Sequence, residues 1–511
     1  MQTGVFAVDD RTRLALATFG VALILGSLGD MLLRATPWGL NVFIWTTVLV
    51  VAAVTLARVW NVGLAGEGRW FLPLAVLFAA GVVWRDSITL GFLDVVAALV
   101  SLSLAALWGR TGRVRLRGLS EYIIGGFYTG AVSAAGPLPA AVQDVRWTEV
   151  TQGRRPGQAL AVARGVTIAA PLLFVFGALF VAADAVFENF VIEVFDIDLV
   201  DIFGHLFLIG FFFWISAGLL WLFLLSREPG GFSFRRPNVL SLGITEIGIT
   251  LGLLDLLFAA FVFVQIRYLF GGAETIITSA GLTYSEYARR GFFELVTVTA
   301  LALPVLLVAH WLLRGEERAH RRVFGGLAGA MVALLFVVVA SALYRMHLYT
   351  AEFGLTELRF YTSAFMFWIS VLLLSFLPTV LTGRRDRFAL VALTTGLAAI
   401  VVINAINPDA LIASTNIARL EEGKRFDPKY LTNLSTDAAP ILAKAMPEIG
   451  ERHVYPPYEG PTPSGETRTF EGPTLRGELL NRWSAEGDWR TWNVSRQRAD
   501  RIASQLDGGL R

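Results

Sequence analysis

The chain has 511 residues, of which 55% are hydrophobic and only 16% are charged. A soluble protein keeps about a quarter of its residues charged to cover its surface, so this composition excludes an ordinary soluble protein and predicts apolar side chains that face lipid. The formal net charge is only +2, no basic run points to nucleic acid as a partner, and the lack of cysteine excludes disulfides, thiolate metal sites and cysteine nucleophiles.

About eleven segments are predicted to cross the membrane, because a helix that spans the ~30 Å hydrocarbon layer needs roughly 17–25 mostly apolar residues. They are residues 14–33, 40–59, 70–84, 88–107, 163–183, 202–225, 243–268, 289–313, 323–343, 361–382 and 388–405. The third is short and the eleventh is only marginally apolar. The sequence therefore predicts an all-α polytopic membrane protein, with the first span retained rather than cleaved as a signal.

The loops that alternate on one side of this map hold most of the arginines, with the largest group in the loop 110–162. Because cytoplasmic loops retain Lys and Arg, we expect a cytoplasmic N-terminus and an extracytoplasmic C-terminus. Two outer turns break the pattern, since Arg290 follows Gly281-Leu-Thr and Arg359 follows Gly354-Leu-Thr. Basic residues are disfavoured on the outer side, so their presence there suggests a function.

The map divides the chain into four parts. They are a four-span segment at 1–109, a cytoplasmic loop at 110–162, a seven-span core at 163–406 and an extracytoplasmic helical region at 407–511. Within the loop, the stretch from Tyr122 to Ala141 is too interrupted by glycine and proline for an ordinary span, so we expect a re-entrant or interfacial element. Acidic and large apolar residues alternate at 184–201, which predicts an amphipathic connector at the outer interface.

The region after the eleventh span begins with Asn407-Pro408-Asp409, which combines an N-cap residue, proline at the first helical position and an acid in the first turn. We expect a helix from there to about Glu422, ended by Gly423. A short helix, a Pro/Gly linker and a closing helix are predicted at 437–446, 455–466 and 494–506.

The two outer turns belong to hairpins that resemble each other, at 243–313 and 323–382. Each hairpin consists of a span, an outer loop ending in Gly-Leu-Thr, a glutamate, an arginine and a descending span. Both point the same way, so a duplication would be parallel, with its axis along the membrane normal. Chance similarity between apolar segments is the alternative.

An ionisable side chain inside a bilayer costs several kcal/mol unless it is paired or wetted, so each one is a functional candidate. The candidates for ligand binding lie in the outer half of the map and are Arg267, Arg290, Glu294, Arg345, Glu357 and Arg359. Three interpretations stay open. In the first, the side chains form structural ion pairs, such as Arg290 with Glu294 or Glu357 with Arg359. In the second, the guanidinium groups line an outward-facing vestibule for a carboxylate or phosphate. In the third, the acids are catalytic.

Asp255 lies near the middle of the seventh span, with no basic neighbour on its own helix. It is a candidate for proton coupling, and a neutral aspartate hydrogen-bonded to a neighbouring helix is the alternative. Glu246 lies about half a helical rotation away, so the two acids do not share a face. The other intramembrane acids of the map are Asp30, Asp94 and Glu246.

The sequence contains no P-loop, no dinucleotide-binding glycine turn, no His-Glu-x-x-His and no Gly-x-Ser-x-Gly. The five histidines are scattered without the spacing of metal ligands. We therefore predict neither a metal site nor a cofactor, and no motif marks the chain as an enzyme.

Transport or binding of an anionic solute is the first functional hypothesis. It places an outward vestibule between the two hairpins, covered by the C-terminal region. The alternative is a membrane enzyme similar in topology to lipid-linked glycosyltransferases, with Asp30 as the base and Asp94 or Glu188 assisting a metal.

A third hypothesis is a scaffold of a cell-envelope complex. In it, Trp483, Trp489 and Trp492 of the C-terminal tail dock a protein partner, because buried tryptophans often anchor interfaces. The lipid bilayer is the one partner that all three hypotheses share.

Several motifs resemble those of one family, and they are Gly281-Leu-Thr-Tyr-Ser-Glu, Tyr344-Arg-Met, Gly354-Leu-Thr-Glu-Leu-Arg, Asn407-Pro-Asp and Asp488-Trp-Arg-Thr-Trp-Asn-Val-Ser-Arg. They are similar to bacterial multi-pass proteins grouped under a domain of unknown function numbered 4173, over roughly residues 160–500. The resemblance implies a location in a bacterial cytoplasmic (inner) membrane. It brings no established activity, substrate or catalytic residue.

Overall fold

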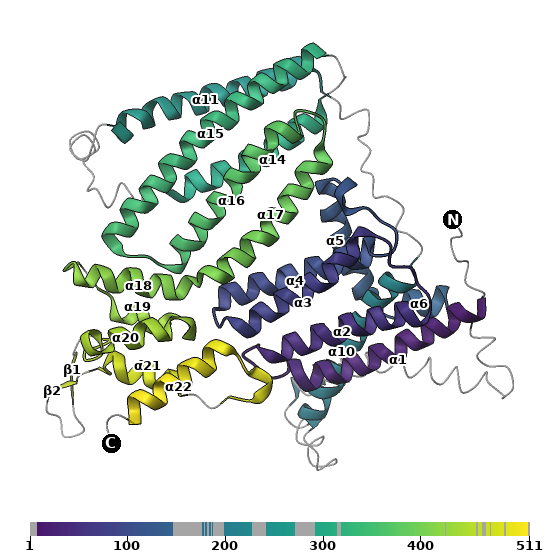
Figure 1. Cartoon of the computed structure of the whole chain (residues 1–511), viewed down its shortest axis with the longest axis horizontal. Helices are drawn as coiled ribbons and strands as arrows, with labels where there is room; N and C mark the ends of the chain where they lie inside the picture. Colours follow the sequence, from purple (N-terminus) through teal and green to yellow (C-terminus); the bar gives the residue numbers. More distant parts are fainter. Residues whose placement is uncertain are drawn as a thin grey trace. The chain divides into compact units, whose positions relative to one another are not determined.

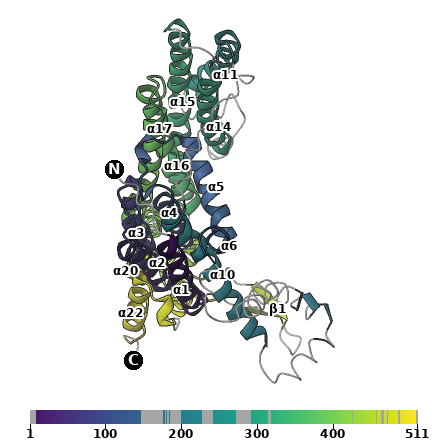
Figure 2. The same ribbon diagram turned by 90° about the vertical axis from the view of Figure 1, so that its right-hand side faces the viewer.

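The structure is a computed structural model of the whole chain (Figures 1 and 2). It describes residues 8–146, 199–226, 242–270, 292–313, 318–424, 426–455, 458–461, 467–470, 472–484 and 487–508, with a few isolated residues between 176 and 187. The chain forms two compact units. The first comprises Met1–Val76, Val100–Gly112 and Ile124–Gly230, and the second comprises Leu77–Leu99, Arg113–Ile123 and Gly231–Arg511.

Within the described residues, ten helices are long and apolar enough to cross a membrane. They run over Asp10–Leu33, Leu40–Val59, Glu67–Trp84, Ile88–Trp108, Asp201–Leu224, Ile244–Gln265, Phe292–Leu312, Arg318–Phe353, Glu357–Thr379 and Arg385–Ile406. Each coincides with a predicted span, so the prediction of an all-α polytopic membrane protein is confirmed. The predicted span at 163–183 and the predicted connector at 184–201 lie largely outside the described residues.

The first unit contains η1 (Glu67–Trp70) and the helices α1 (Val8–Leu33), α2 (Leu40–Val59), α6 (Leu138–Gln143), α10 (Leu199–Leu224) and most of α5 (Leu119–Ala135). Its helices α1 and α10 pack closely because α1 presents glycine at the crossing. A Cβ added to Gly29 would lie 2.4 Å from the Phe212 ring. Trp45 of α2 donates from Nε1 to the backbone oxygen of Leu25 at 3.0 Å, which holds α2 against α1. Small residues and polar contacts of this kind hold spans together in lipid.

The hairpin of α3 (Phe71–Trp84) and α4 (Ile88–Trp108) contributes to both units, and its turn belongs to the second. A short 3₁₀ turn, η2 (Val114–Leu116), follows it. The stretch 122–141, predicted to be too interrupted for one span, is helical in two pieces, α5 and α6. Gly136 separates them at φ +59°, a left-handed conformation that suits glycine.

The membrane helices of the second unit are α11 (Ile244–Phe270), α14 (Phe292–Leu312), α15 (Arg318–Phe353), α16 (Glu357–Thr379) and α17 (Arg385–Ile406). Figure 2 shows α11, α14 and α15 beside one another. One apolar core contains Met331 and Leu335 of α15, Leu306 of α14 and Phe376 of α16. At 1.5 Å per residue, α15 is about 54 Å long, so its ends extend beyond a hydrocarbon layer of ~30 Å.

The C-terminal region follows α17 and has an apolar core of its own. Its elements are α18 (Pro408–Glu421), α19 (Pro428–Asn433), η4 (Thr436–Ala438), α20 (Ala439–Ile449), β1 (Tyr458–Pro461), β2 (Thr467–Phe470), α21 (Leu475–Trp483), η5 (Trp489–Thr491) and α22 (Val494–Gly508). Ile412, Leu442 and Leu479 are among its buried residues. The predicted cap is confirmed, because the Asn407 side chain accepts a hydrogen bond from the Ala410 N–H at 3.2 Å. Gly423 follows α18 at φ +74°, as its predicted role as a helix stop requires.

Two predictions for this region need correction. The predicted linker 455–466 contains strand β1, which pairs antiparallel with β2, so part of it has regular structure. Trp483 is only 4% exposed and lies on the face of α21 that packs into the core with Leu479. It is therefore not available to dock a protein partner.

The left-handed Gly354 between α15 and α16 gives a test of this packing. It lies at φ +81°, and a Cβ there would lie 2.4 Å from Oδ1 of Asn416, whose side chain bonds the backbone N–H and C=O of Leu355 at 2.8 and 2.9 Å. We expect Gly354→Ala to lower the free energy of unfolding by about 1–2 kcal/mol more than Gly383→Ala does. Gly383 has the same backbone conformation, φ +79°, with no atom within 4 Å of its added Cβ. Thermal unfolding in detergent measures both losses, and equal losses would contradict the assigned contact between α18 and this turn.

Candidate functional site

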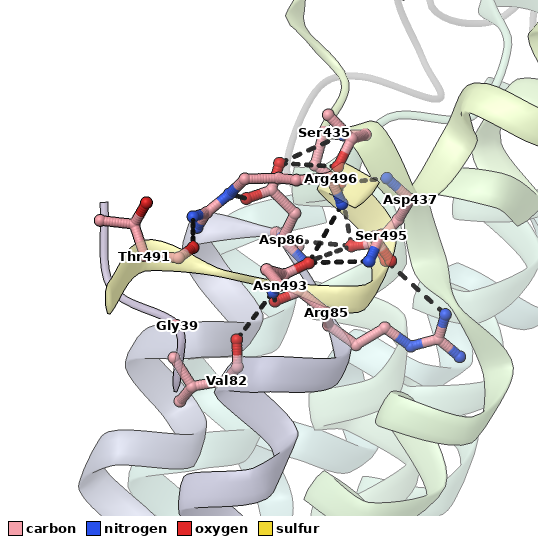
Figure 3. A network of polar contacts seen from close by, with 12 residues as sticks. Gly39, Val82, Arg85, Asp86, Ser435, Asp437, Thr491, Asn493, Ser495 and Arg496 are labelled. Carbon is pink, nitrogen blue, oxygen red and sulfur yellow. Dashed lines mark hydrogen bonds and ion pairs between the residues drawn. The ribbon is translucent and has the colours of Figure 1, made fainter. Parts of the chain in front are cut away.

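A polar cluster joins the turn between α3 and α4 to the C-terminal region (Figure 3). Its members are Arg85, Asp86, Ser87, Asp409, Ser435, Asp437, Asn493, Ser495 and Arg496. In the turn, the backbone N–H groups of Asp86 and Ser87 have no helical partner, because α4 begins only at Ile88. The Asp437 Oδ2 accepts hydrogen bonds from both groups, at 2.8 and 3.1 Å.

Asp437 is buried, and its charge is balanced on several sides. The Ser495 hydroxyl donates to Oδ1 at 2.5 Å, and the Ser435 hydroxyl lies 3.0 Å from Oδ2. The Arg85 Nη1 lies 3.6 Å from Oδ1. A buried carboxylate is tolerated when it is both paired and hydrogen-bonded, as here.

Arg85 is the cation of this pair and is itself only 9% exposed. Its Nε donates to the backbone oxygen of Asn404 at 2.8 Å, and its guanidinium lies 4.3 Å from the centre of the Trp84 ring. Burial lowers the pKa of the Arg85 guanidinium, and the charge of Asp437 opposes this change. Arg85 therefore links the end of α17 to the C-terminal region through a charged group.

The segment before α22 supplies a second group of contacts. The Asn493 Nδ2 donates to the backbone oxygens of Val82 and Arg85, both at 2.8 Å. Its Oδ1 accepts from the Ser495 N–H at 2.8 Å, which caps the start of α22. Asn493 thus binds the last turn of α3 and begins α22 at the same time, as Figure 3 shows.

Asp86 completes the cluster on the side of α22. Its Oδ1 accepts from the Arg496 Nε at 2.6 Å, and its Oδ2 accepts from the Thr436 hydroxyl at 2.9 Å. Arg496 also donates to the backbone oxygen of Thr491. Both charged residues of the turn are therefore paired with residues of the C-terminal region.

Asp409 of α18 is a second buried acid of the cluster. Its Oδ2 accepts hydrogen bonds from the backbone N–H of Ser435, at 3.1 Å, and from the Ser435 hydroxyl, while Oδ1 has no donor. The Glu357 carboxyl lies close to the same residue. Burial, together with the charge of Asp437, raises the pKa of Asp409, and the bonds from Ser435 oppose that rise.

Asp94 of α4 connects the cluster to the interior of the spans. It is completely buried, and its Oδ1 accepts from the Asn404 Nδ2 at 2.9 Å. A Cβ on Gly81 would lie 2.4 Å from Asp94 Oδ2, so the α3–α4 hairpin needs glycine at that position. Because Arg85 bonds the backbone of Asn404 and approaches Asp437, a continuous chain of polar contacts runs from Asp94 to the C-terminal region.

Two of the predicted ligand residues are engaged with neighbours. The buried Arg345 of α15 donates from Nη2 to Oε1 of Gln265 on α11 at 2.8 Å. Arg359 stacks over the Tyr349 ring at 4.0 Å and donates to the backbone oxygen of Gly354. Arg345 thus joins α15 to α11, and Arg359 holds the turn between α15 and α16.

The other predicted ligand residues do not come together in the described part of the chain. Glu294 is exposed near the start of α14. Arg290 and the side chain of Arg267 lie outside the described residues, as does the first copy of the predicted repeat around Gly281. Glu357 is the predicted residue that the structure brings to the polar cluster, through Asp409.

The intramembrane acids differ in their surroundings. Both carboxyl oxygens of Asp255 are buried and have no hydrogen-bond partner among the described residues. Glu246 is exposed and accepts from the Gly243 N–H at 2.5 Å at the start of α11. Asp255 therefore remains the predicted proton-coupling candidate, and Glu246 caps a helix.

Asp30 has a partner that the sequence did not indicate. Its Oδ2 lies 2.6 Å from Nδ1 of His205 on α10, and the other ring nitrogen, Nε2, lies 2.6 Å from Nη1 of Arg34. A guanidinium only donates, so Nε2 accepts and the ring proton is on Nδ1, directed at Asp30. Arg34 also pairs with Asp201. Asp30 thus fixes the orientation of the His205 ring.

The sequence pointed to part of the polar cluster. Asn407-Pro-Asp409 and the segment Asp488–Arg496 stood out as motifs, and the structure shows that both contact the cluster. The roles of Asn404 and Asp437 had no local signal, because each acts on a residue hundreds of positions away. Within the described residues, no three His, Cys, Asp or Glu side chains gather as metal ligands would.

Asp437→Asn tests whether the cluster holds the C-terminal region in place. The amide would keep the shape of the side chain, but its N–H groups would face other donors and Arg85 would stay buried without its carboxylate. We therefore expect the free energy of unfolding to fall by about 3–5 kcal/mol. The control is Asp488→Asn, because Asp488 is exposed and pairs only with its neighbour Arg490. Limited proteolysis and thermal unfolding in detergent measure the effect. A melting temperature as high for Asp437→Asn as for Asp488→Asn would contradict this role.

Comparison with known proteins identifies a family without an established activity. A family model described as a domain of unknown function (DUF4153) matches residues 72–445. The predicted number, 4173, is therefore wrong, whereas the prediction of a multi-pass family of unknown function is confirmed. No curated protein and no solved structure matches the chain. The matched range includes Arg85, Asp94, Asn404, Asp409 and Asp437, and because it covers well over half of the residues, the chain belongs to the DUF4153 family.

Proposed function

We propose that this protein is a proton-coupled transport or ligand-binding protein of a bacterial inner membrane, with an anionic solute as its ligand. The observation that carries the proposal is the fully buried Asp94, joined by hydrogen bonds through Asn404 and Arg85 to the polar cluster. Ionisable residues inside membrane spans mark ion and substrate pathways more often than packing contacts, because their burial is costly.

A proton on Asp94 is supported by two unsatisfied oxygens. Asp94 Oδ2 and Asn404 Oδ1 are both buried and both lack a donor, although the two side chains are hydrogen-bonded to each other. A protonated Asp94 supplies a donor to this pair, and an ionised Asp94 does not. A buried acid that gains and loses a proton is what coupling to a proton gradient requires.

The sidedness of the proposal has support within the second unit. Asp437 binds the turn 85–87, and Arg419 of α18 donates to the backbone oxygens of Ala351 and Glu352. The C-terminal region therefore contacts the α3–α4 turn and the α15–α16 turn on one side of the membrane. The predicted map has an even number of crossings between these turns, as this arrangement requires. The arginine bias makes that side extracytoplasmic, with the N-terminus in the cytoplasm.

The anionic nature of the solute rests on the arginines of the outer half. Arg345 is buried within a candidate span and bonds the neutral amide of Gln265. Guanidinium groups match carboxylate and phosphate geometry, which favours these classes of ligand.

Proton movement in proteoliposomes tests the proposal. The full-length protein is reconstituted with a trapped pH-sensitive dye, and phosphate, sulfate and small dicarboxylates are added outside. We expect at least one of these anions to drive proton movement in the wild type and in the exposed-site variant Asp488→Asn. Asp94→Asn should abolish it, because the amide keeps the contact with Asn404 but cannot titrate. Equal proton movement with Asp94→Asn, or none in the wild type with any of these anions, would contradict the proposal.

The orientation of His205 by Asp30 favours a second candidate, a membrane enzyme that acts on a lipid-linked substrate. An aspartate that holds the Nδ1 proton leaves Nε2 to act as a general base once Arg34 moves away. In this candidate, Asp30 positions the base. The sequence had suggested that Asp30 is itself the base.

Replacement of the histidine tests this second candidate. His205→Gln keeps a polar side chain but cannot take up a proton, so an enzyme would lose its activity and the glycan composition of the cell envelope would change. His310→Gln is the control, because His310 contacts Arg385 elsewhere in the chain. An unchanged envelope with His205→Gln excludes the enzyme of this type.

A further inference from the structure

The segment before α22 exposes two large aromatic side chains beside the end of a membrane span. Trp489 is 59% exposed and Trp492 is 38% exposed, whereas Thr491 and Asn493 next to them are buried. Trp84, the last residue of α3, is 45% exposed. Tryptophan is too costly to leave in water at three neighbouring sites without a reason.

Hydrogen bonds fix the depth of this segment relative to α3. Asn493 bonds the backbone oxygens of Val82 and Arg85, and the Ser495 hydroxyl donates to the backbone oxygen of Trp84 at 3.1 Å. Val82 and Trp84 lie in the last turn of the candidate span Glu67–Trp84. One helical turn rises 5.4 Å, so Asn493 lies at about the boundary of the hydrocarbon layer.

The remaining exposed surface of α22 has a different character. Its exposed side chains are Gln497, Arg498, Asp500, Arg501, Ser504, Gln505 and Asp507. This helix therefore faces water, whereas the two exposed tryptophans lie in the turn η5 and at the residue after it.

We infer that residues 488–493 form an interfacial anchor, in which Trp489 and Trp492 insert into the headgroup layer of the bilayer beside Trp84. The indole ring is apolar with one N–H donor, which suits it to this layer, where tryptophan is enriched in membrane proteins. Arg490 lies between the two rings in sequence and pairs with Asp488, so its charge is balanced near the lipid headgroups. The anchor and the polar cluster together hold the C-terminal region against the bilayer. This inference does not depend on the proposed transport function.

The absence of native cysteine allows a direct test. The single variants Trp489→Cys, Trp492→Cys, Arg498→Cys and Leu99→Cys each carry a nitroxide in full-length protein reconstituted in vesicles of phosphatidylethanolamine and phosphatidylglycerol. Leu99 is 58% exposed within α4 and serves as the lipid-facing reference, and Arg498 serves as the water-facing reference. Electron paramagnetic resonance measures collisions with oxygen, which concentrates in lipid, and with a water-soluble nickel chelate.

We expect the ratio of oxygen to nickel collisions at positions 489 and 492 to be several-fold higher than at 498 and to approach that at 99. Ratios equal to that at 498 would overturn the inference and leave the tryptophans facing water, where a protein partner would be what covers them. A second measurement uses the fluorescence of the native tryptophans instead of a spin label. Lipids brominated near the headgroup should quench wild-type fluorescence more strongly than that of the double variant Trp489→Phe/Trp492→Phe, and equal fractional quenching would overturn the inference.

Discussion

Two backbone N–H groups in the turn between α3 and α4 set the constraint on which the second unit depends. A polar group near the hydrocarbon boundary must have a partner, because water is scarce there and an unpaired N–H costs several kcal/mol. The partner is Asp437, which comes from the C-terminal region. A carboxylate buried in this way needs its own compensation, and Arg85, Ser435 and Ser495 provide it. Hydrogen bonding of this one turn therefore brings together the α3–α4 turn, the segment around Asp437 and the start of α22.

The same arrangement explains why the C-terminal region is part of the membrane structure and not an appendage. Its apolar core makes it compact, but its polar edge is completed only by residues of the spans. Asn493 shows this most directly, since one amide binds α3 through Nδ2 and begins α22 through Oδ1. Loss of either contact leaves a buried polar atom unpaired, so helix capping and docking are coupled.

The buried acids of the second unit differ in their partners. Asp86 and Asp437 each have an arginine close by. Asp94 meets only the Asn404 amide, and its Oδ2 has no donor among the described residues. We connect the acid that has no cation beside it with function.

The sequence by itself determined the membrane class, ten of the predicted spans, the helix start at Asn407 and the stop at Gly423, because length, apolar content and capping are local properties. It identified Asp30, Asp94 and Glu357 as costly residues but not their partners. Only the tertiary structure decided that Asp94 meets Asn404, that Asp30 orients His205, and that the C-terminal region closes on the α3–α4 turn. These contacts join residues far apart in the chain, and their geometry follows from how the helices pack and not from any local pattern.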